Sequence, residues 1–150
     1  MFKHILVPVD GSEPSNHALG TAIDLARESG ARIRLIHVVD NTAFLTGYDP
    51  SGGSSGHLFS ALRDSGLQIL QQGTADATAK GVQADHVLVD QVGTRLGDAV
   101  AQAAAEFGAD LIVVGTHGRR GPSRLLLGSG AEQVIRLAPV PVLVTREPRR

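Results

Sequence analysis

Short apolar runs, each long enough for a strand and too short for most helices, alternate along the chain with segments of helical periodicity. The runs are rich in valine, isoleucine and leucine, and they lie at residues 5–9, 33–39, 82–89, 111–114 and 140–144. Strands that are apolar throughout are buried on both faces, and intervening helices make successive strands parallel. The alternation predicts an α/β fold, an open doubly wound sheet of five parallel strands with helices on both faces. Periodicity leaves the strand order open.

Helix start and stop signals fit this plan. Ser12 is placed to cap a first helix, Pro14 suits its first turn, and Gly30 ends it. Further helices are expected at 58–80, 96–107 and 130–137. Ser129 and Glu132 have capping-box spacing, which predicts a helix start at Ser129. The prolines at 139 and 141 bracket the start of the last strand and favour an edge position for it.

Composition narrows the class of protein. A chain of 150 residues suits one domain spanning 1–150, and a 42% hydrophobic content is that of a globular protein. A net charge of −1 opposes a surface built to bind nucleic acid or an anionic membrane. The absence of cysteine excludes disulfides and thiolate metal sites. No apolar stretch approaches the ~20 residues of a membrane span, and the N-terminus lacks a signal-peptide pattern, so we expect a soluble cytoplasmic protein.

One segment breaks the alternation. Residues 41–57 are rich in glycine and serine and have little to bury, which predicts a flexible surface loop. The segment follows the second strand at its carboxyl end. A lid over a ligand site is therefore the alternative interpretation.

The segment from Gly115 to Gly130 runs from the end of a strand to the start of a helix. A helix start presents unpaired N–H groups and the positive end of the helix dipole, and glycines let the backbone approach a ligand closely. Arg119, Arg120 and Arg124 add positive charge where phosphates would lie. The segment predicts an anion site, with a tight turn carrying solvated arginines as the alternative.

Two common nucleotide motifs are excluded. A P-loop needs Gly-Lys followed by serine or threonine, and neither Lys3 nor Lys80 follows a glycine. A dinucleotide fingerprint that begins at Gly128 fails at Gln133, where its third glycine would stand.

Catalytic and metal motifs are weak as well. Residues 52–56 have the spacing of a nucleophile elbow, but no strand precedes them, so no catalytic residue is predicted. The six histidines lack metal-ligand spacing, so no dedicated metal site is predicted either. His37 is expected to be a satisfied core or edge histidine, and His117 could contact a phosphate.

Gly115-x-x-Gly118, nine residues, then Gly128-Ser129 resembles the nucleotide signature of the universal stress protein family. Segments 5–12, 110–115 and 139–144 also look like strands of that family, so the resemblance covers nearly the whole chain. It implies the strand order 3-2-1-4-5 and a homodimer through the last strand, residues 140–145, or a higher oligomer. Gly130 departs from the more usual valine, and Pro122 from a large apolar residue.

That strand order puts the topological switch point between the first and fourth strands, which end at Asp10 and Gly115. The resemblance implies that Asp10 and the backbone of Val38 contact adenosine, while the glycines and Ser129 surround ribose and phosphates. The candidate binding residues are Pro8, Asp10, Val38, Gly115, His117, Gly118, Arg119, Gly128, Ser129 and Gly130. ATP is the expected ligand, with ADP or AMP as alternatives, and Mg²⁺ would be held by phosphate oxygens and water.

Three functions remain open. The first is a nucleotide-dependent regulatory switch in stress response, with little or no hydrolysis and an unidentified protein partner. The second is a slow ATPase or a nucleotidyl-transfer enzyme that uses the same site, for which no residue is assigned to activate water. The third is an interaction module that binds no nucleotide, against which the intact glycine and serine set argues.

Overall fold

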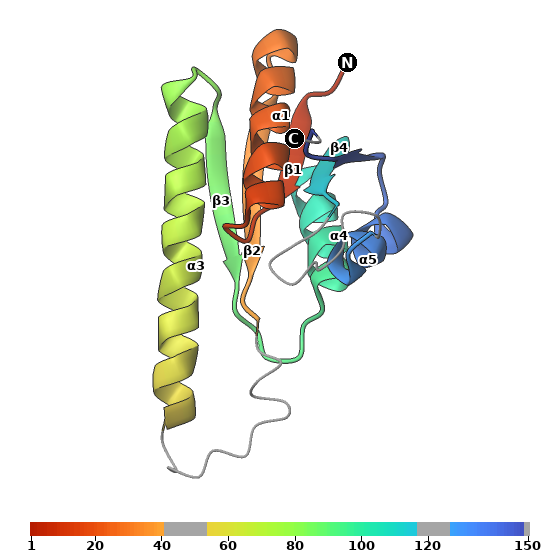
Figure 1. Cartoon of the computed structure of the whole chain (residues 1–150). Coiled ribbons are helices and arrows are strands. Elements are labelled where there is room, and N and C mark those ends of the chain that lie inside the picture. The colour runs from red at the N-terminus through yellow and green to blue at the C-terminus, as the bar shows by residue number, and fades with distance from the viewer. Residues whose placement is uncertain (41–53, 117–126, 149–150) are drawn as a thin grey trace.

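The computed structural model of the protein describes residues 1–40, 54–116 and 127–148. Five strands form one parallel sheet in the order β3-β2-β1-β4-β5 (Figure 1). The strands are β1 (His4–Pro8), β2 (Arg32–Val38), β3 (Ala84–Val89), β4 (Leu111–Gly115) and β5 (Val142–Thr145). The predicted fold class, the strand order implied by the resemblance and the edge position of the last strand are all confirmed.

In the described part of the chain, four helices cover the two faces of the sheet. They are α1 (Glu13–Ser29), α3 (Ser54–Ala79), α4 (Leu96–Phe107) and α5 (Ser129–Leu137). Alternate residues of a strand face opposite sides. Ile5 and Val7 of β1 accordingly join the core under α1 and α3, while Leu6 joins the core under α4 and α5. Both cores are almost entirely aliphatic.

The helix α1 is bounded as the sequence predicts. Ser12 is its N-cap, and the Ser12 Oγ accepts a hydrogen bond from the Ser15 N–H at 3.3 Å. Gly30 ends the helix at φ 75°, a left-handed conformation that glycine adopts without strain.

The predicted helix start at Ser129 is confirmed, but the capping box that indicated it does not form. Gly128 is the N-cap, and Ser129 is already the first helical residue, so the Ser129 hydroxyl makes no capping bond. The Glu132 carboxylate accepts a hydrogen bond from Arg136 one turn later, at 2.9 Å. The (i, i+4) ion pair takes the place of the reciprocal cap.

The predicted loop is also shorter than expected at its carboxyl side. Residues 54–57 belong to α3, which begins at Ser54 instead of Leu58. Residues 41–53, and with them the lid interpretation, lie outside the described residues. The first turns of α3 extend beyond the carboxyl edge of the sheet (Figure 1).

A glycine lets α3 lie close to β2. A Cβ atom added at Gly66 would lie 2.5 Å from the His37 Cδ2 atom, closer than any side chain allows. Helical periodicity gave no reason to expect this contact, because it depends on where α3 packs.

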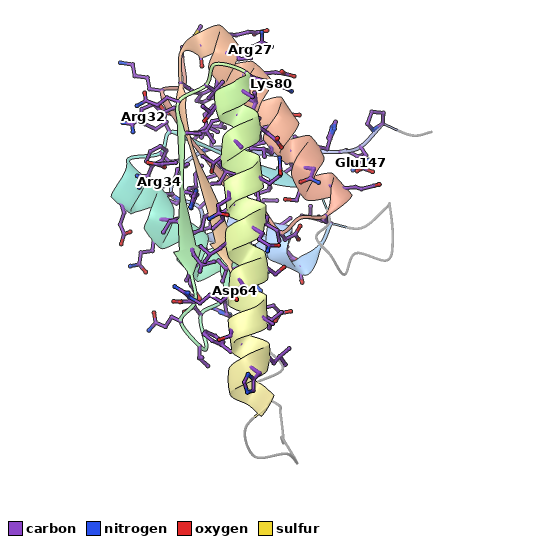
Figure 2. All side chains as sticks on the ribbon, turned by 90° about the vertical axis from the view of Figure 1, so that its left-hand side faces the viewer. Arg27, Arg32, Arg34, Asp64, Lys80 and Glu147 are labelled. Atoms are coloured by element: carbon purple, nitrogen blue, oxygen red, sulfur yellow. The ribbon has the colours of Figure 1, made fainter. Side chains whose placement is uncertain are left out.

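Basic residues mark the edge opposite the carboxyl ends of the strands. Figure 2 shows Arg27 and Lys80 at the same end of the molecule, where α1 and α3 end. Positive side chains at this position complement the negative ends of the helix dipoles. Across the described ranges, no helix is long and apolar enough to cross a membrane.

An ion pair joins β2 and β3 on the α4 side of the sheet. Arg34 donates to Asp85 through Nε at 2.8 Å and through Nη2 at 2.9 Å, and the guanidinium lies 4.4 Å from the centre of the Phe107 ring. The hydrogen bond from Arg34 lowers the pKa of Asp85 from its ordinary value of 3.8, although partial burial acts in the opposite direction.

We expect Asp85→Asn to destabilise the protein in a pH-dependent way. The pKa of Asp85 is lower in the folded state than in the unfolded state. The ion pair therefore stabilises the fold at pH values above the pKa of the unfolded state, and this stabilisation is lost as the pH falls through the pKa of the folded state. The side chains are 30% and 42% exposed, so solvent screening limits the difference to less than about 1 kcal/mol. Urea unfolding of the parent and the variant between neutral and acid pH measures this difference.

The control is Asp98→Asn, which breaks the more exposed Arg95–Asp98 pair. It should leave the free energy of unfolding nearly unchanged at every pH. Equal losses in the two variants would contradict the assignment.

Candidate functional site

The strands β1 and β4 are neighbours, but the chain leaves them toward opposite faces of the sheet. After β1 it enters α1 on one face, and after β4 it leads to α5 on the other. Ligands of open α/β sheets bind at such a switch point, outside the carboxyl ends of the strands.

Proline at position 8 removes a hydrogen-bond donor from the sheet at this point. Successive residues of a strand direct their main-chain N–H and C=O groups toward opposite neighbouring strands. The Val9 N–H donates to the Ile36 carbonyl of β2, so the main chain of residue 8 is directed toward β4. Proline has no N–H to donate there. The pairing of β1 with β2 extends to Pro8↔Ile36, whereas its pairing with β4 extends only to Leu6↔Ile112. The pairing of β1 with β4 therefore stops before the last residues of the two strands.

A hydrogen-bonded turn follows β1 and holds Asp10. The Asp10 Oδ1 accepts from the Ser12 N–H at 2.9 Å, and the Asp10 N–H donates to the Ser15 Oγ at 3.0 Å. Gly11, between them, has φ 82°. The half-buried Asp10 is thus held at the carboxyl edge, and an ionised carboxylate there accepts hydrogen bonds from hydroxyl or amino groups.

The end of β4 packs directly on the first turn of α1. A Cβ atom added at Gly115 would lie 2.7 Å from the Pro14 carbonyl oxygen. Glycine is therefore required at 115 by packing, independently of any ligand. This contact joins the two walls of the switch point, the turn after β1 and the end of β4.

Two backbone hydrogen bonds close the base of the glycine-rich segment. The Thr116 N–H donates to the Thr145 carbonyl of β5 at 3.1 Å, and the Gly128 N–H donates to the Thr116 carbonyl at 2.6 Å. The N-terminus of α5 is thereby held at the end of β4. Its first amides, at Ser129 and Gly130, have no acceptor within the helix and lie at the positive end of its dipole.

Packing also accounts for Gly130, where the family more often has valine. A Cβ atom at this position would lie 2.8 Å from the Leu96 Cδ2 atom of α4. A larger residue would require Leu96 to move.

The structure brings most of the predicted residues to one edge. Those at the carboxyl ends of β1, β2 and β4 or at the start of α5 are Pro8, Asp10, Val38, Gly115, Gly128, Ser129 and Gly130. Three others, His117, Gly118 and Arg119, lie outside the described residues, as do Arg120, Pro122 and Arg124.

Sequence analysis missed two buried hydroxyl residues at this edge. Ser15 is 6% exposed and Thr145 is 8% exposed, and each is hydrogen-bonded to backbone. A serine in the first turn of a helix and a threonine in a strand give no distinctive signal, because their partners come from other elements. The prediction for His37 is confirmed, since it is 8% exposed and its Nδ1 lies 2.7 Å from the Val9 carbonyl oxygen.

A shallow hollow lies elsewhere, between β3 and α4, and its lining includes Val87, Gln102 and Arg34. Arg34 is already bonded to Asp85, so the hollow offers a ligand no free positive charge from that side chain. Among the residues that the structure describes, no three histidine or carboxylate side chains are grouped to hold a metal ion.

Comparisons with known proteins agree on one family. Residues 1–146 match the model of the universal stress protein family. A universal stress protein of Methanocaldococcus jannaschii is 36% identical over 150 residues, covering 100% of this chain and 85% of the relative. The universal stress protein YxiE of Bacillus subtilis is 35% identical over 156 residues, covering 97% of this chain and all of the relative.

Solved structures show the same fold. The hypothetical protein MJ0577 superposes with a TM-score of 0.83 at 25% identity, covering 100% of this chain and 99% of that one. A universal stress protein in complex with cAMP has a TM-score of 0.67 at 25% identity, covering 97% of each chain. Because the family match spans nearly the whole sequence and both relatives align over almost all of it, the protein belongs to the universal stress protein family.

Proposed function

We propose that the protein binds an adenine nucleotide at the switch point between β1 and β4 and acts as a nucleotide-dependent regulator in stress response. The observation that carries the proposal is the placement of α5, whose first amides are held at the end of β4 by the Gly128–Thr116 hydrogen bond. The contact between Gly115 and Pro14 joins that wall to the turn that holds Asp10. A donor site for anions and a carboxylate acceptor thus share one edge.

The phosphates would be bound by the α5 side of the site. The amides of Ser129 and Gly130 are donors that need no side chain, and the glycine-rich segment adds Gly118 and Arg119 from the sequence. Because the segment is long and carries several arginines, ATP is the proposed ligand, with ADP or AMP as alternatives. Mg²⁺ would accompany the nucleotide, coordinated by phosphate oxygens and water.

The adenosine part would lie on the β1 side. Asp10 suits ribose hydroxyls or base amino groups, because an ionised carboxylate only accepts hydrogen bonds. The Val38 backbone ends β2 beside β1 and would contact the same group. The structural neighbour solved with cAMP supports an adenosine ligand in a chain of this fold.

The regulatory part of the proposal rests on β5. This edge strand and α5 expose the large apolar side chains Leu143, Ile135 and Leu137, which favours a homodimer through residues 140–145. The Thr116–Thr145 hydrogen bond links β5 to the base of the phosphate segment. Nucleotide binding would alter contacts with the second copy or with a protein partner, and the proposal places this switch in the cytoplasm.

Hydrolysis is not needed for such a switch, because preferential binding to one state shifts the equilibrium. An ATPase or nucleotidyl-transfer enzyme that uses the same site is the second candidate function. The described residues assign no side chain the task of activating water, so the proposal includes little or no turnover.

The first experiment identifies the nucleotide that the protein carries. The protein is purified without added nucleotide and denatured, and the released small molecules are analysed by mass spectrometry. ATP at about one per chain, as expected for a slow or absent turnover, supports the switch. Released ADP or AMP calls for a turnover assay, and detectable turnover favours the enzyme. An empty protein that also fails to bind ATP·Mg²⁺ on titration contradicts nucleotide binding.

We expect Asp10→Ala to weaken ATP·Mg²⁺ binding by about tenfold or more, because hydrogen bonds to a charged acceptor are worth ~1.5–3 kcal/mol. Asp10→Asn keeps an oxygen for the Ser12 N–H and separates the loss of charge from a loosened turn. Isothermal titration measures both variants. Asp64→Ala, the same change at an exposed site on α3 (Figure 2), is the control and should bind as the parent does. Parent affinity in Asp10→Ala would remove Asp10 from the site.

We expect Leu143→Asp to convert a homodimer to monomers, because it places a charge at an exposed apolar side chain of the edge strand β5. Sedimentation equilibrium measures the mass. Val92→Asp, at an exposed apolar residue beyond β3, is the matched control and should leave the dimer intact. A dimer that survives Leu143→Asp but dissociates with Val92→Asp would place the interface at the other side of the sheet.

A further inference from the structure

Buried polar side chains gather at the carboxyl ends of β1 and β4. Across residues 1–40, 57–116 and 127–148, those buried are Ser15 at 6%, His37 at 8% and Thr145 at 8% exposed. Burial of a polar group is unfavourable unless the group is hydrogen-bonded, and each of these bonds a backbone atom next to the switch point. The rest of the buried core is apolar.

Two of these side chains hold the same peptide group. His37 of β2 contacts the Val9 carbonyl oxygen through Nδ1 at 2.7 Å, and the Ser15 Oγ of α1 accepts from the Asp10 N–H at 3.0 Å. Because a carbonyl can only accept, His37 carries a proton on Nδ1. The peptide that joins Val9 to Asp10 cannot rotate without breaking hydrogen bonds to two different elements.

The same network reaches the Asp10 carboxylate. The Ser15 N–H donates to the Ser12 Oγ, and the Ser12 N–H donates to the Asp10 Oδ1 at 2.9 Å. The Ser15 hydroxyl therefore holds the Asp10 amide, and the Ser15 main-chain N–H is bonded to Ser12, the residue whose own amide holds the Asp10 carboxylate. Both the backbone and the carboxylate of Asp10 are oriented before any ligand arrives.

His37 is itself held in place by α3. The missing side chain of Gly66 leaves room for the imidazole ring, and an added Cβ atom there would lie 2.9 Å from Nε2. The ring lies between β2 and α3 and cannot turn away from Val9 while α3 stays packed.

We propose that Ser15 and His37 are positioning residues for Asp10, which clamp the Val9–Asp10 peptide so that the carboxylate points toward the adenosine part of the nucleotide. The inference rests on the proposed nucleotide site. Ser15 and His37 need not touch the nucleotide, since they act through Asp10. A clamp of this kind lowers the cost of ordering the site when the ligand binds.

The test uses two variants at each position, one that removes the hydrogen-bonding group (the removing variant) and one that keeps it (the conserving variant). Ser15→Ala and His37→Leu remove the hydrogen bonds, whereas Ser15→Thr keeps the hydroxyl and His37→Asn places an amide nitrogen near the position of Nδ1. A net hydrogen bond of ~0.5–1.5 kcal/mol corresponds to a loss of affinity of about two- to thirteenfold for each removing variant. The conserving variants should recover ATP·Mg²⁺ affinity to within about twofold of the parent, as isothermal titration measures.

Ser29→Ala is the matched control, because Ser29 is also a hydroxyl residue of α1 bonded to backbone, at the Leu25 carbonyl. It should bind ATP·Mg²⁺ as the parent does. A double-mutant cycle with Asp10→Ala distinguishes the positioning role from a purely structural role. In that background Ser15→Ala and His37→Leu should cause no further loss of affinity, whereas general loosening of the fold would lower affinity in both backgrounds.

Amide hydrogen exchange adds a measurement that needs no nucleotide. Exchange of the Asp10 N–H should be faster in Ser15→Ala than in the parent and restored in Ser15→Thr. If His37→Leu fails to fold, Ser15→Ala alone decides the test. We expect Ser15→Ala to fold, because alanine is favourable in a helix. If the parent binds ATP and the removing variants bind equally well, or if exchange is unchanged, the positioning role is wrong and the nucleotide site stands. A parent that binds no nucleotide overturns both.

Discussion

The absence of an amide hydrogen at Pro8 is the constraint on which the site depends. The central strand β1 pairs with β2 along its whole length, whereas its pairing with β4 ends at Leu6, because Pro8 has no N–H to continue the ladder. The turn at Asp10 follows β1 at this point, and the start of α5 is held at the end of β4.

At this edge, close helix packing also determines the positions of the groups in the proposed site. Gly115 permits α1 to press against the end of β4, and Gly66 permits α3 to press against His37. In each case the small residue brings a helix close enough for a polar contact or a backbone approach. Aliphatic side chains can be repacked in several arrangements, because their contacts are not directional. A hydrogen-bonded peptide group, in contrast, has a defined orientation. The polar contacts therefore orient the groups at the carboxyl edge of the sheet, and the apolar cores stabilise the fold.

The sequence predicted the elements of the fold better than their contacts. The apolar runs and the glycine stops are local signals, so strands and helices fell within a few residues of their observed bounds. Strand order is non-local and came only from the resemblance. The helix start at Ser129 is predicted correctly, but the capping box does not form, because Gly128 is the N-cap and Ser129 is the first helical residue. Ser15 and Thr145 were missed because burial and bonding partners are properties of tertiary structure.

Thr116 gives the proposed switch a physical route. Its carbonyl accepts from Gly128 at the start of α5, and its amide donates to Thr145 on the edge strand. A phosphate bound by the first amides of α5 would favour one position of Gly128, and through Thr116 one position of β5. Coupling of this kind requires only that the ligand prefer one arrangement over another, and it acts equally in both directions. A partner bound at the β5 edge would then change nucleotide affinity by the same factor by which the nucleotide changes affinity for the partner.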